Sequence, residues 1–177
     1  MQPITTDDFK AALGHFASGV TVMTTRVDGE DFGMTASAFS SLSLEPPLVL
    51  ICVKKHNRMW EALQGASGFA VNILSSSQQD LSNRFAGGTV DAAGNWIPWP
   101  EDVSRFEGLE VNRAPGSGAA LLSGALAHLD CSVWKQVDGG DHTIVIGRVE
   151  FSAATPRGEG SPLVYWGGQY RSIQGER

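Results

Sequence analysis

The fold is decided by residues 20–53, a stretch that reads VTVMTTRVDGEDFGMTASAFSSLSLEPPLVLICV. It opens on Val20–Thr25, where β-branched residues predominate, and an Asp28-Gly29 pair separates this segment from the next extended one. Asp-Gly between two such segments is a strong hairpin signal. Pro46-Pro47 then precedes Leu48–Val53, an apolar run typical of a strand that is buried on both faces. The stretch therefore predicts antiparallel neighbouring strands.

Similar patterns recur along the rest of the chain. Capping residues predict short helices that begin at Thr5, Asn57 and Ser77, and the first of them is expected to end near Gly19. A Gly-Gly turn at 138–141 predicts a second hairpin. Further strands are expected at 69–74, 121–137, 142–151 and 163–166. Tight hairpins force antiparallel pairing, and closure removes sheet edges, so we expect a mainly β protein: a small closed antiparallel barrel with a few short peripheral helices.

Length and composition exclude several classes of protein. A chain of 177 residues is expected to form a single domain over 1–177, with an irregular loop excursion at 87–118. Its net charge of −6 disfavours nucleic acid as a partner, because phosphate contacts need a basic face. No signal-peptide pattern occurs, and the longest apolar run has six residues, so no membrane association is expected. Cys52 and Cys131 are interpreted as reduced thiols in a cytoplasmic protein.

Motifs for protein-borne chemistry are missing from the sequence. There is no G-x-G-x-x-G after a strand, no Walker loop, no H-E-x-x-H and no C-x-x-C. The four histidines, at 15, 56, 128 and 142, lack ligand spacing, so no metal site is expected. This pattern favours a bound cofactor that brings its own chemistry.

Two segments could hold such a cofactor. Thr35–Ser43 has hydroxyls at five of its nine positions, which could satisfy the polar edge of a heteroaromatic ring, although a polar outer face would look the same. Lys54–Arg58 places three basic residues at the start of a predicted helix, where a phosphate would be stabilised, although a solvated loop is the alternative. Since both segments flank one strand pair, together they favour a phosphorylated heteroaromatic ligand.

Four motifs in this order resemble the flavin reductase-like family. They are the segment from Gly33 to Leu50, the segment FAVNIL at 69–74 with the downstream Gln78, Leu81, Phe85 and Ala86, the segment GDHTIVIGRV at 140–149, and the segment PLVYWGGQY at 162–170. The resemblance covers most of residues 9–171 except 87–118. It implies an FMN-binding split barrel that forms a homodimer and acts as an NAD(P)H:flavin oxidoreductase. Such a protein passes hydride to flavin N5 of FMN or FAD, with NADH or NADPH as co-substrate, and often supplies a partner monooxygenase.

The resemblance also implies roles for individual residues. The isoalloxazine would be lined by Thr35, Ala36, Ser37, Ala38 and Phe39. The ribityl chain and phosphate would be reached by Ser40, Ser41, Cys52, Val53, Lys54, Asn57 and Arg58. The flavin tail would be bordered by Arg84, Phe85 and Ala86, and the nicotinamide side by His142 and Tyr170.

Several alternatives remain open from the sequence. His142 follows a hairpin turn and Tyr170 could close the barrel, so each has a structural interpretation beside the functional one. Met59 stands where family members frequently carry Ser or Thr, and methionine cannot donate to phosphate. Trp60, Trp134 and Phe151 are expected in the core. An FMN-binding electron carrier and a pyridoxamine-phosphate oxidase-like flavoprotein are the alternative functions, and residues 87–118 could form a lid or a docking surface.

Overall fold

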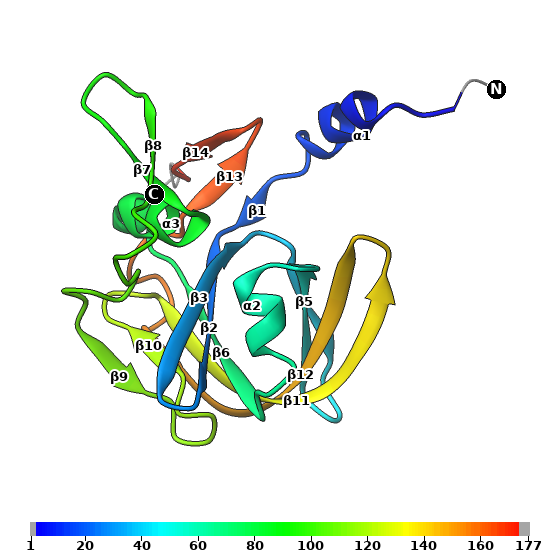
Figure 1. The fold of residues 1–177 in the computed structure, drawn as a ribbon, viewed down its shortest axis with the longest axis vertical. Coiled ribbons are helices and arrows are strands. Elements are labelled where there is room, and N and C mark those ends of the chain that lie inside the picture. The colour runs from blue at the N-terminus through cyan, green and yellow to red at the C-terminus, as the bar shows by residue number, and fades with distance from the viewer. Residues whose placement is uncertain (1–2, 174–177) are drawn as a thin grey trace.

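The computed structural model describes residues 3–173, which form a mainly β fold with three short α-helices and one 3-10 turn (Figure 1). The helical elements are α1 (Thr6–Leu13), α2 (Arg58–Ala62), η1 (Ser76–Gln78) and α3 (Gln79–Ala86). The strands of the main sheet are β2 (Thr21–Val27), β3 (Glu30–Ala36), β4 (Phe39–Ser43), β5 (Leu48–Lys54), β6 (Gly68–Ile73), β11 (Ala127–Gly139) and β12 (His142–Ala154). The shorter strands are β1 (Ser18–Gly19), β7 (Gly88–Val90), β8 (Trp96–Pro98), β9 (Val111–Arg113), β10 (Ala120–Leu122), β13 (Val164–Trp166) and β14 (Gln169–Arg171).

Seven antiparallel strands form one curved sheet in the order β3-β2-β6-β11-β12-β5-β4. Both predicted hairpins are confirmed: β2 pairs with β3, and β11 pairs with β12. Asp28 and Gly29 both adopt positive φ, as the favoured two-residue hairpin turn requires. Local turns therefore set these two strand pairs, whereas the pairings of β6 with β2 and β11 and of β5 with β12 are long-range.

The expected closed barrel is wrong in one respect, because the two edges of the sheet are not hydrogen-bonded to each other. Within residues 3–173, β3 and β4 lie at opposite ends of the strand order, although only Ser37 and Ala38 separate them in the chain. Helix α2 packs against β2, β3 and β5 instead (Figure 1). Its buried Met59 and Leu63 belong to the main core cluster. The sheet is thus rolled but open, and a helix covers the opening.

The main core lies inside the rolled sheet. Alternate residues of β5 and β12 point inward and are fully buried, among them Ile51, Val53 and Val145. Burial thus alternates along β5 even though its residues from Leu48 to Val53 are all apolar. A second cluster, which includes Phe85, Leu74 and Leu163, fixes α3 to one end of the sheet. That end carries the pockets described below.

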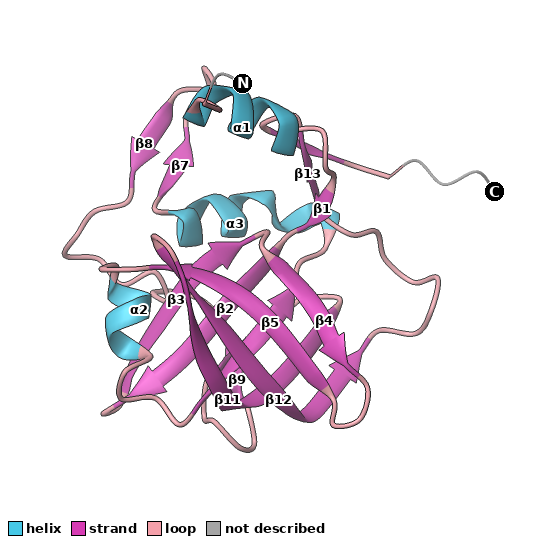
Figure 2. Cartoon of the chain, turned by 90° about the vertical axis from the view of Figure 1, so that its right-hand side faces the viewer, coloured by secondary structure: helices cyan, strands magenta, loops and turns pink. Residues whose placement is uncertain are grey.

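Residues 87–118, expected to form an irregular loop, contain regular β structure. They contain the β7–β8 hairpin and strand β9, which pairs with β10. The hairpin rises beside α3, at the same end of the molecule as the β13–β14 hairpin (Figures 1 and 2). Its tip is closed by Asp91, whose Oδ1 accepts hydrogen bonds from the backbone N–H groups of Ala93 and Asn95. Such side-chain turns leave no hydrophobic periodicity in the sequence, which is why the hairpin escapes prediction.

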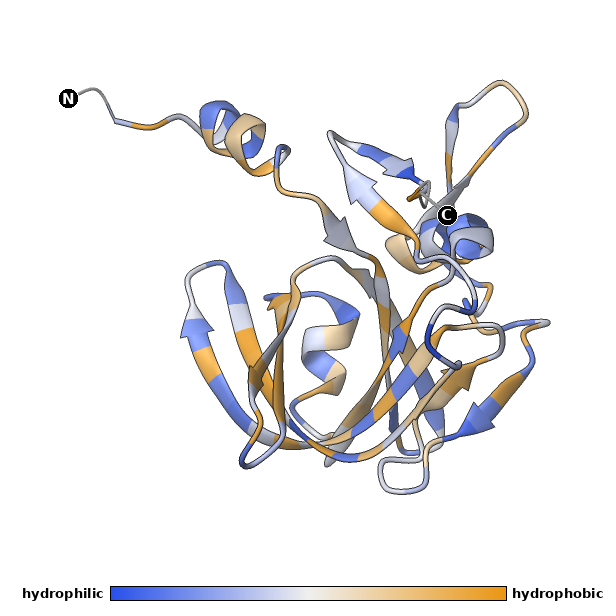
Figure 3. Cartoon of the chain, turned by 180° about the vertical axis from the view of Figure 1, so that it is seen from behind, coloured by the Kyte–Doolittle hydropathy of each residue, from blue (hydrophilic) through white to orange (hydrophobic). Residues whose placement is uncertain are grey.

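Helix α1 forms an arm that leaves the body of the molecule (Figures 1 and 3). Thr5 caps it as predicted, but the helix ends at Leu13 rather than near Gly19. Its apolar residues Phe9 and Leu13 are more than half exposed, and the following Phe16 is 77% exposed. None of the helices within residues 3–173 is long and apolar enough to span a membrane.

Two of the three aromatic side chains expected in the core are largely exposed. Trp134 is 52% exposed and Phe151 40%. Register shifts lie next to both residues in the β11–β12 ladder. Because a β-bulge changes which face of the sheet a residue occupies, alternation cannot be extrapolated through one. Trp60 does pack against the core and donates from Nε1 to Thr143 Oγ1 at 2.9 Å.

Candidate functional site

Three pockets lie along β3 and along the segment that connects β3 to β5. The first, the Arg58 pocket, lies against the start of β3. The second, the Tyr170 pocket, contains Thr35 at the end of that strand. The third, the Phe39 groove, shares Ser37 with the Tyr170 pocket. The candidate site is therefore a series of neighbouring pockets that one strand connects.

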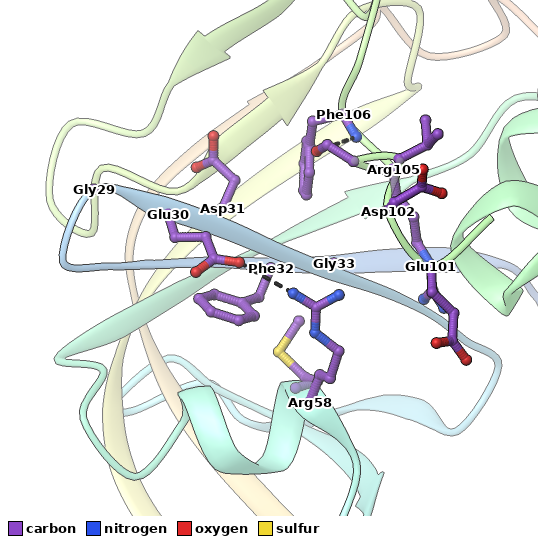
Figure 4. Close-up of a pocket in the computed structure, with 13 residues that line it drawn as sticks. Gly29, Glu30, Asp31, Phe32, Gly33, Arg58, Glu101, Asp102, Arg105 and Phe106 are labelled. Carbon is purple, nitrogen blue, oxygen red and sulfur yellow. Dashed lines mark hydrogen bonds and ion pairs between the residues drawn. The ribbon is translucent and has the colours of Figure 1, made fainter. Parts of the chain in front are cut away.

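The Arg58 pocket has a volume of about 450 Å³ and receives two guanidinium groups (Figure 4). Arg58 comes from the first turn of α2, and Arg105 comes from the loop between β8 and β9. Arg105 donates from Nη1 to the carbonyl of Phe85 at 3.1 Å. Burial, together with the nearby charge of Arg58, lowers the pKa of Arg105. These two guanidinium groups offer paired donors to an anion, but four carboxylates line the same pocket.

Four carboxylates also line the Arg58 pocket: Asp31 and Glu30 form ion pairs with arginines, whereas Glu101 and Asp102 form none within residues 3–173. Asp31 is held by Arg26 at 2.9 Å and by Arg113 at 2.5 Å. Burial alone would raise the pKa of Asp31, but the hydrogen bonds from Arg113 and Arg26 outweigh it and lower the pKa. Glu30 pairs with Arg58 at 3.1 Å on the exposed rim. A phosphate bound here would therefore compete with Glu30 for Arg58.

The Tyr170 pocket, of about 420 Å³, lies between α3, the end of β3 and the two hairpins that rise beside them. Tyr170 and Ser82 are joined by a hydrogen bond of 2.8 Å between their hydroxyls. Thr35 donates from Oγ1 to the carbonyl of Ser82 at 2.6 Å. Burial raises the pKa of Tyr170, so its phenol stays protonated at neutral pH. These hydrogen bonds hold the hydroxyl groups of Thr35, Ser82 and Tyr170 in place at the pocket.

Asn83 provides an unsatisfied polar group in the wall of the same pocket. Its side chain is 4% exposed, and Nδ2 has no hydrogen-bond partner among the described residues. An unsatisfied buried amide donor costs about 1–3 kcal/mol. Nδ2 itself has almost no accessible surface, so the unsatisfied donor lies within the packing of α3 and a ligand in the pocket does not reach it.

The Phe39 groove is the widest of the three, with a volume of about 710 Å³. It runs from α1 to the start of β4 and the middle of β5, and Phe39, Ser40 and Cys52 lie on its floor. Tyr165 and Trp166 of β13 form the opposite wall. Cys52 and Cys131 are both free thiols, as expected from the sequence.

Of the seventeen residues named from the sequence, nine line one of these pockets. They are Thr35, Ser37, Ala38, Phe39, Ser40, Cys52, Ala86 and Tyr170 in the second and third pockets, and Arg58 adds a ninth in the first. The structure thus brings together the hydroxyl-rich segment, the start of α2 and the C-terminal tyrosine.

The other eight lie elsewhere in the described chain. The side chains of Ala36, Val53 and Phe85 are buried, Val53 and Ala36 in the main core and Phe85 beneath α3. Ser41 and Lys54 are exposed, and Lys54 lies opposite His142 at the ends of β5 and β12. His142 contacts Asp141 at 2.8 Å. Asn57 caps α2 by accepting from the backbone N–H of Trp60.

Arg84, which the resemblance places beside the flavin tail, lines none of the three pockets. Its guanidinium stacks on Trp99 at 4.4 Å and donates to the carbonyls of Ser104 and Glu107. It therefore ties the loop after β8 to α3. Met59, the residue that departs from the family pattern, is buried in the core and also lines the Arg58 pocket.

Sequence reasoning missed Arg105, Asn83 and Trp96 among the pocket residues. Arg105 and Trp96 fall within 87–118, where no periodicity assigns a position to any side chain. Asn83 lies on the predicted third helix, but only the packing of α3 shows that this residue lines a pocket.

The fold matches that of solved flavin reductases. The NADH:FAD oxidoreductase of Streptomyces globisporus superposes with a TM-score of 0.86 at 34% identity, over 99% of this chain and 97% of that one. The same oxidoreductase in complex with NAD and FAD fragments gives a TM-score of 0.83 at 33% identity, over 98% of both chains.

The chain belongs to the flavin reductase-like family. The family model described as "Flavin reductase like domain" matches residues 13–174, which confirms the assignment made from the sequence. The reductase subunit HsaB of a flavin-dependent monooxygenase from Mycobacterium tuberculosis is 37% identical over 96% of this chain and 83% of its own length. The reductase component of 4-hydroxyphenylacetate 3-monooxygenase from Thermus thermophilus is 40% identical over 93% of this chain and 95% of its own length.

Proposed function

We propose that this chain is an NAD(P)H-dependent flavin reductase that delivers reduced FMN or FAD to a separate monooxygenase. The observation that carries the proposal is the placement of two chemically different pockets along β3. Its first residues line the Arg58 pocket, and Thr35 near its end lines the Tyr170 pocket. An anion site and a hydroxyl-lined aromatic site on one strand fit a phosphorylated heteroaromatic molecule. Family membership and the named relatives support the same activity.

The phosphate end of the flavin would bind in the Arg58 pocket. Arg58 and Arg105 supply two permanently charged donors there, and arginine forks bind phosphate through paired hydrogen bonds. Sequence reasoning assigned this role to Lys54 and Arg58, whereas the geometry favours Arg58 together with Arg105.

The ring end would lie along Ser37–Ser40, where the Phe39 groove and the Tyr170 pocket meet. A bound flavin supplies the hydride acceptor, its N5, to the nicotinamide. The chain's own residues hold the reacting rings in contact and exclude water, since proximity and orientation lower the barrier without an acid–base group. Tyr170, protonated and held by Ser82, would donate or accept a hydrogen bond at the rim of this ring site.

A steady-state assay tests the proposal. The purified protein, mixed with FMN or FAD and with NADH or NADPH, should cause loss of the reduced nicotinamide absorbance in at least one of the four combinations. An electron carrier would bind flavin without such turnover, and a pyridoxamine-phosphate oxidase-like protein would not respond to nicotinamide. A flat trace with all four combinations would refute the proposal.

We also infer that the protein acts as a homodimer of single-domain subunits. The support is the arm formed by α1, whose apolar residues Phe9, Leu13 and Phe16 are more than half exposed. Leu42 and Leu44, at the end of β4 and just after it, are exposed as well, Leu44 at 89%. Large exposed apolar side chains, above all those gathered on one helix, are typical of a surface that another subunit covers.

A further inference from the structure

Two carboxylates of the Arg58 pocket have no role in the function described above. Glu101 and Asp102 come from the loop between β8 and β9, and both residues are exposed. Neither forms an ion pair within the part of the chain that the structure describes. A phosphate bound by Arg58 and Arg105 would therefore share the pocket with two negative charges that no arginine or lysine neutralises.

The Arg58 pocket is also larger than a phosphate requires. Its volume of about 450 Å³ falls in the range of roughly 300–1,000 Å³ that is typical of sites for whole small molecules. Phe32 and Phe106 line it, and the central carbon of the Arg58 guanidinium lies 5.9 Å from the centre of the Phe32 ring (Figure 4). The pocket therefore offers paired donors, free acceptors and aromatic surface to a single ligand.

A flavin that ends in a phosphate monoester fits these features poorly. The terminal phosphate of FMN is such a group, and phosphate monoesters carry a charge of about −1.5 to −2 at neutral pH. Glu101 and Asp102 would repel this charge, and FMN has no second ring to cover the phenylalanine side chains.

The adenosine diphosphate half of FAD matches all three features. Each of its two linked phosphates carries one negative charge, which suits a pair of guanidinium groups. Its ribose hydroxyls can donate to carboxylates, as they do to the Asp or Glu of many dinucleotide sites. Its adenine has a flat face that can stack on an aromatic side chain.

We propose that Glu101 and Asp102 make the protein selective for FAD over FMN, because they accept hydrogen bonds from the ribose of the adenosine and repel a terminal phosphate. The inference rests on the proposed reductase function, which places the phosphate end of the flavin in this pocket, and it names the flavin that the site prefers.

Calorimetric titration with FAD and with FMN, without nicotinamide, tests the inference by binding alone. Wild type should bind FAD at least about five-fold more tightly than FMN. The double variant Glu101→Gln/Asp102→Asn should bind FAD about three-fold to ten-fold more weakly, because hydrogen bonds to charged acceptors are the stronger ones. It should bind FMN about two-fold to five-fold more tightly, because the repulsion is gone. A purely structural disturbance would weaken the binding of both flavins.

Glu107→Gln/Glu110→Gln is the matched control. It makes the same change of charge in the same loop, at two exposed residues that line none of the three pockets. Its Kd values for both flavins should stay within about two-fold of wild type.

NADH contains the same adenosine diphosphate group, so the test also separates the two sources. ADP-ribose should displace FAD from wild type, and the double variant should require about three-fold to ten-fold more of it. The KM for NADH of the double variant should stay within about two-fold of wild type. An increase in that KM, with the Kd for FAD unchanged, would assign the pocket to the nicotinamide dinucleotide instead.

Three results would overturn the inference. They are a wild type that binds FMN as tightly as FAD, a double variant that shifts both flavins in the same direction or neither, and a loss of affinity for NADH in place of FAD. The two single variants give the same measurement if the double variant does not fold. Titration requires no turnover, so flavins that bind with the expected selectivity but are never reduced would refute the reductase function alone.

Discussion

Gly33 of β3 lies directly beneath the ring of Phe85 on α3: a Cβ at position 33 would be 2.4 Å from Phe85 Cε1 and 3.0 Å from Phe106 Cζ. Phe85 and Phe106 meet edge to face, with their ring centres 5.0 Å apart. Phe106 follows Arg105 in the β8–β9 loop. Its packing near Gly33 therefore positions Arg105 at the Arg58 pocket.

Gly33→Ala should therefore destabilise the fold by about 1–3 kcal/mol, the cost of overpacking a full core, and should also raise the flavin KM by displacing Arg105. Gly147→Ala is the matched control, because its Cβ would lie 2.4 Å from Phe69 Cζ in the main core, away from the pockets. Denaturant melts and steady-state kinetics measure both effects. Equal flavin KM values for the two variants would contradict the link to Arg105.

Glu30 should act as a competitor for phosphate at Arg58. Glu30→Gln removes the paired charge, and an exposed ion pair is worth about 0.2–1 kcal/mol. The KM for FMN should fall by up to roughly five-fold, and Arg58→Ala should raise it. Glu159→Gln, an exposed carboxylate in the β12–β13 loop, is the control that should leave the KM unchanged. A higher KM in Glu30→Gln would show that Glu30 orients Arg58 rather than competing for it.

Asp31 should contribute stability that depends on pH. Its two arginine partners lower its pKa in the folded state below the unfolded value of about 3.9. Its contribution is therefore fully present above about pH 4–5 and is lost as the pH falls through the folded-state pKa. We expect Asp31→Asn to lower the free energy of unfolding by about 1–3 kcal/mol at neutral pH.

Urea melts of wild type and Asp31→Asn from neutral pH down to about pH 3 would measure this difference. The difference in the free energy of unfolding between the two proteins should be constant near neutral pH and should shrink below about pH 4. A difference that grows on acidification would refute the ion-pair account.

The two thiols should differ in reactivity. Burial raises the pKa of Cys131 to about 12, and the residue is 1% exposed, so its thiolate is scarce and inaccessible. Cys52 is half-buried and lines the Phe39 groove. A disulfide reagent should therefore label one thiol per native chain, Cys52→Ser should abolish the labelling, and FMN should slow it in wild type. Labelling of both thiols before unfolding would contradict the burial of Cys131.

The α1 arm should be necessary for self-association. Leu13→Asp and Phe16→Asp place a charge in the exposed apolar surface, and a buried unpaired charge is strongly unfavourable at an interface. Light scattering after size exclusion should give twice the chain mass for wild type and a single-chain mass for the variants. Lys10→Asp, also on α1, is a control for a change in charge alone. A monomeric wild type would remove the basis for a homodimer.

The sequence by itself determined the local elements of this protein and its family. Asp28-Gly29 and the Gly-Gly turn before His142 specified two hairpins, because turn chemistry acts on neighbours in the chain. Thr5 and Asn57 specified helix starts for the same reason. The hydroxyl-rich segment around Ser37 and the basic turn before Arg58 are each formed by consecutive residues, so the sequence predicts them too. Ser37 and Arg58 both line pockets in the structure.

Only the tertiary structure decided whether the two edge strands of the sheet pair and which side chains from distant parts of the sequence come together. The edge strands β3 and β4 do not pair with each other, and α2 packs against β2, β3 and β5 instead; these long-range contacts have no local signature. The meeting of Arg105 with Arg58, and of Trp96 with Asn83, joins residues from separate elements through a hairpin that no periodicity predicts. Such contacts arise from packing over the whole chain, because side chains far apart in sequence come together only when the core beneath them is complete.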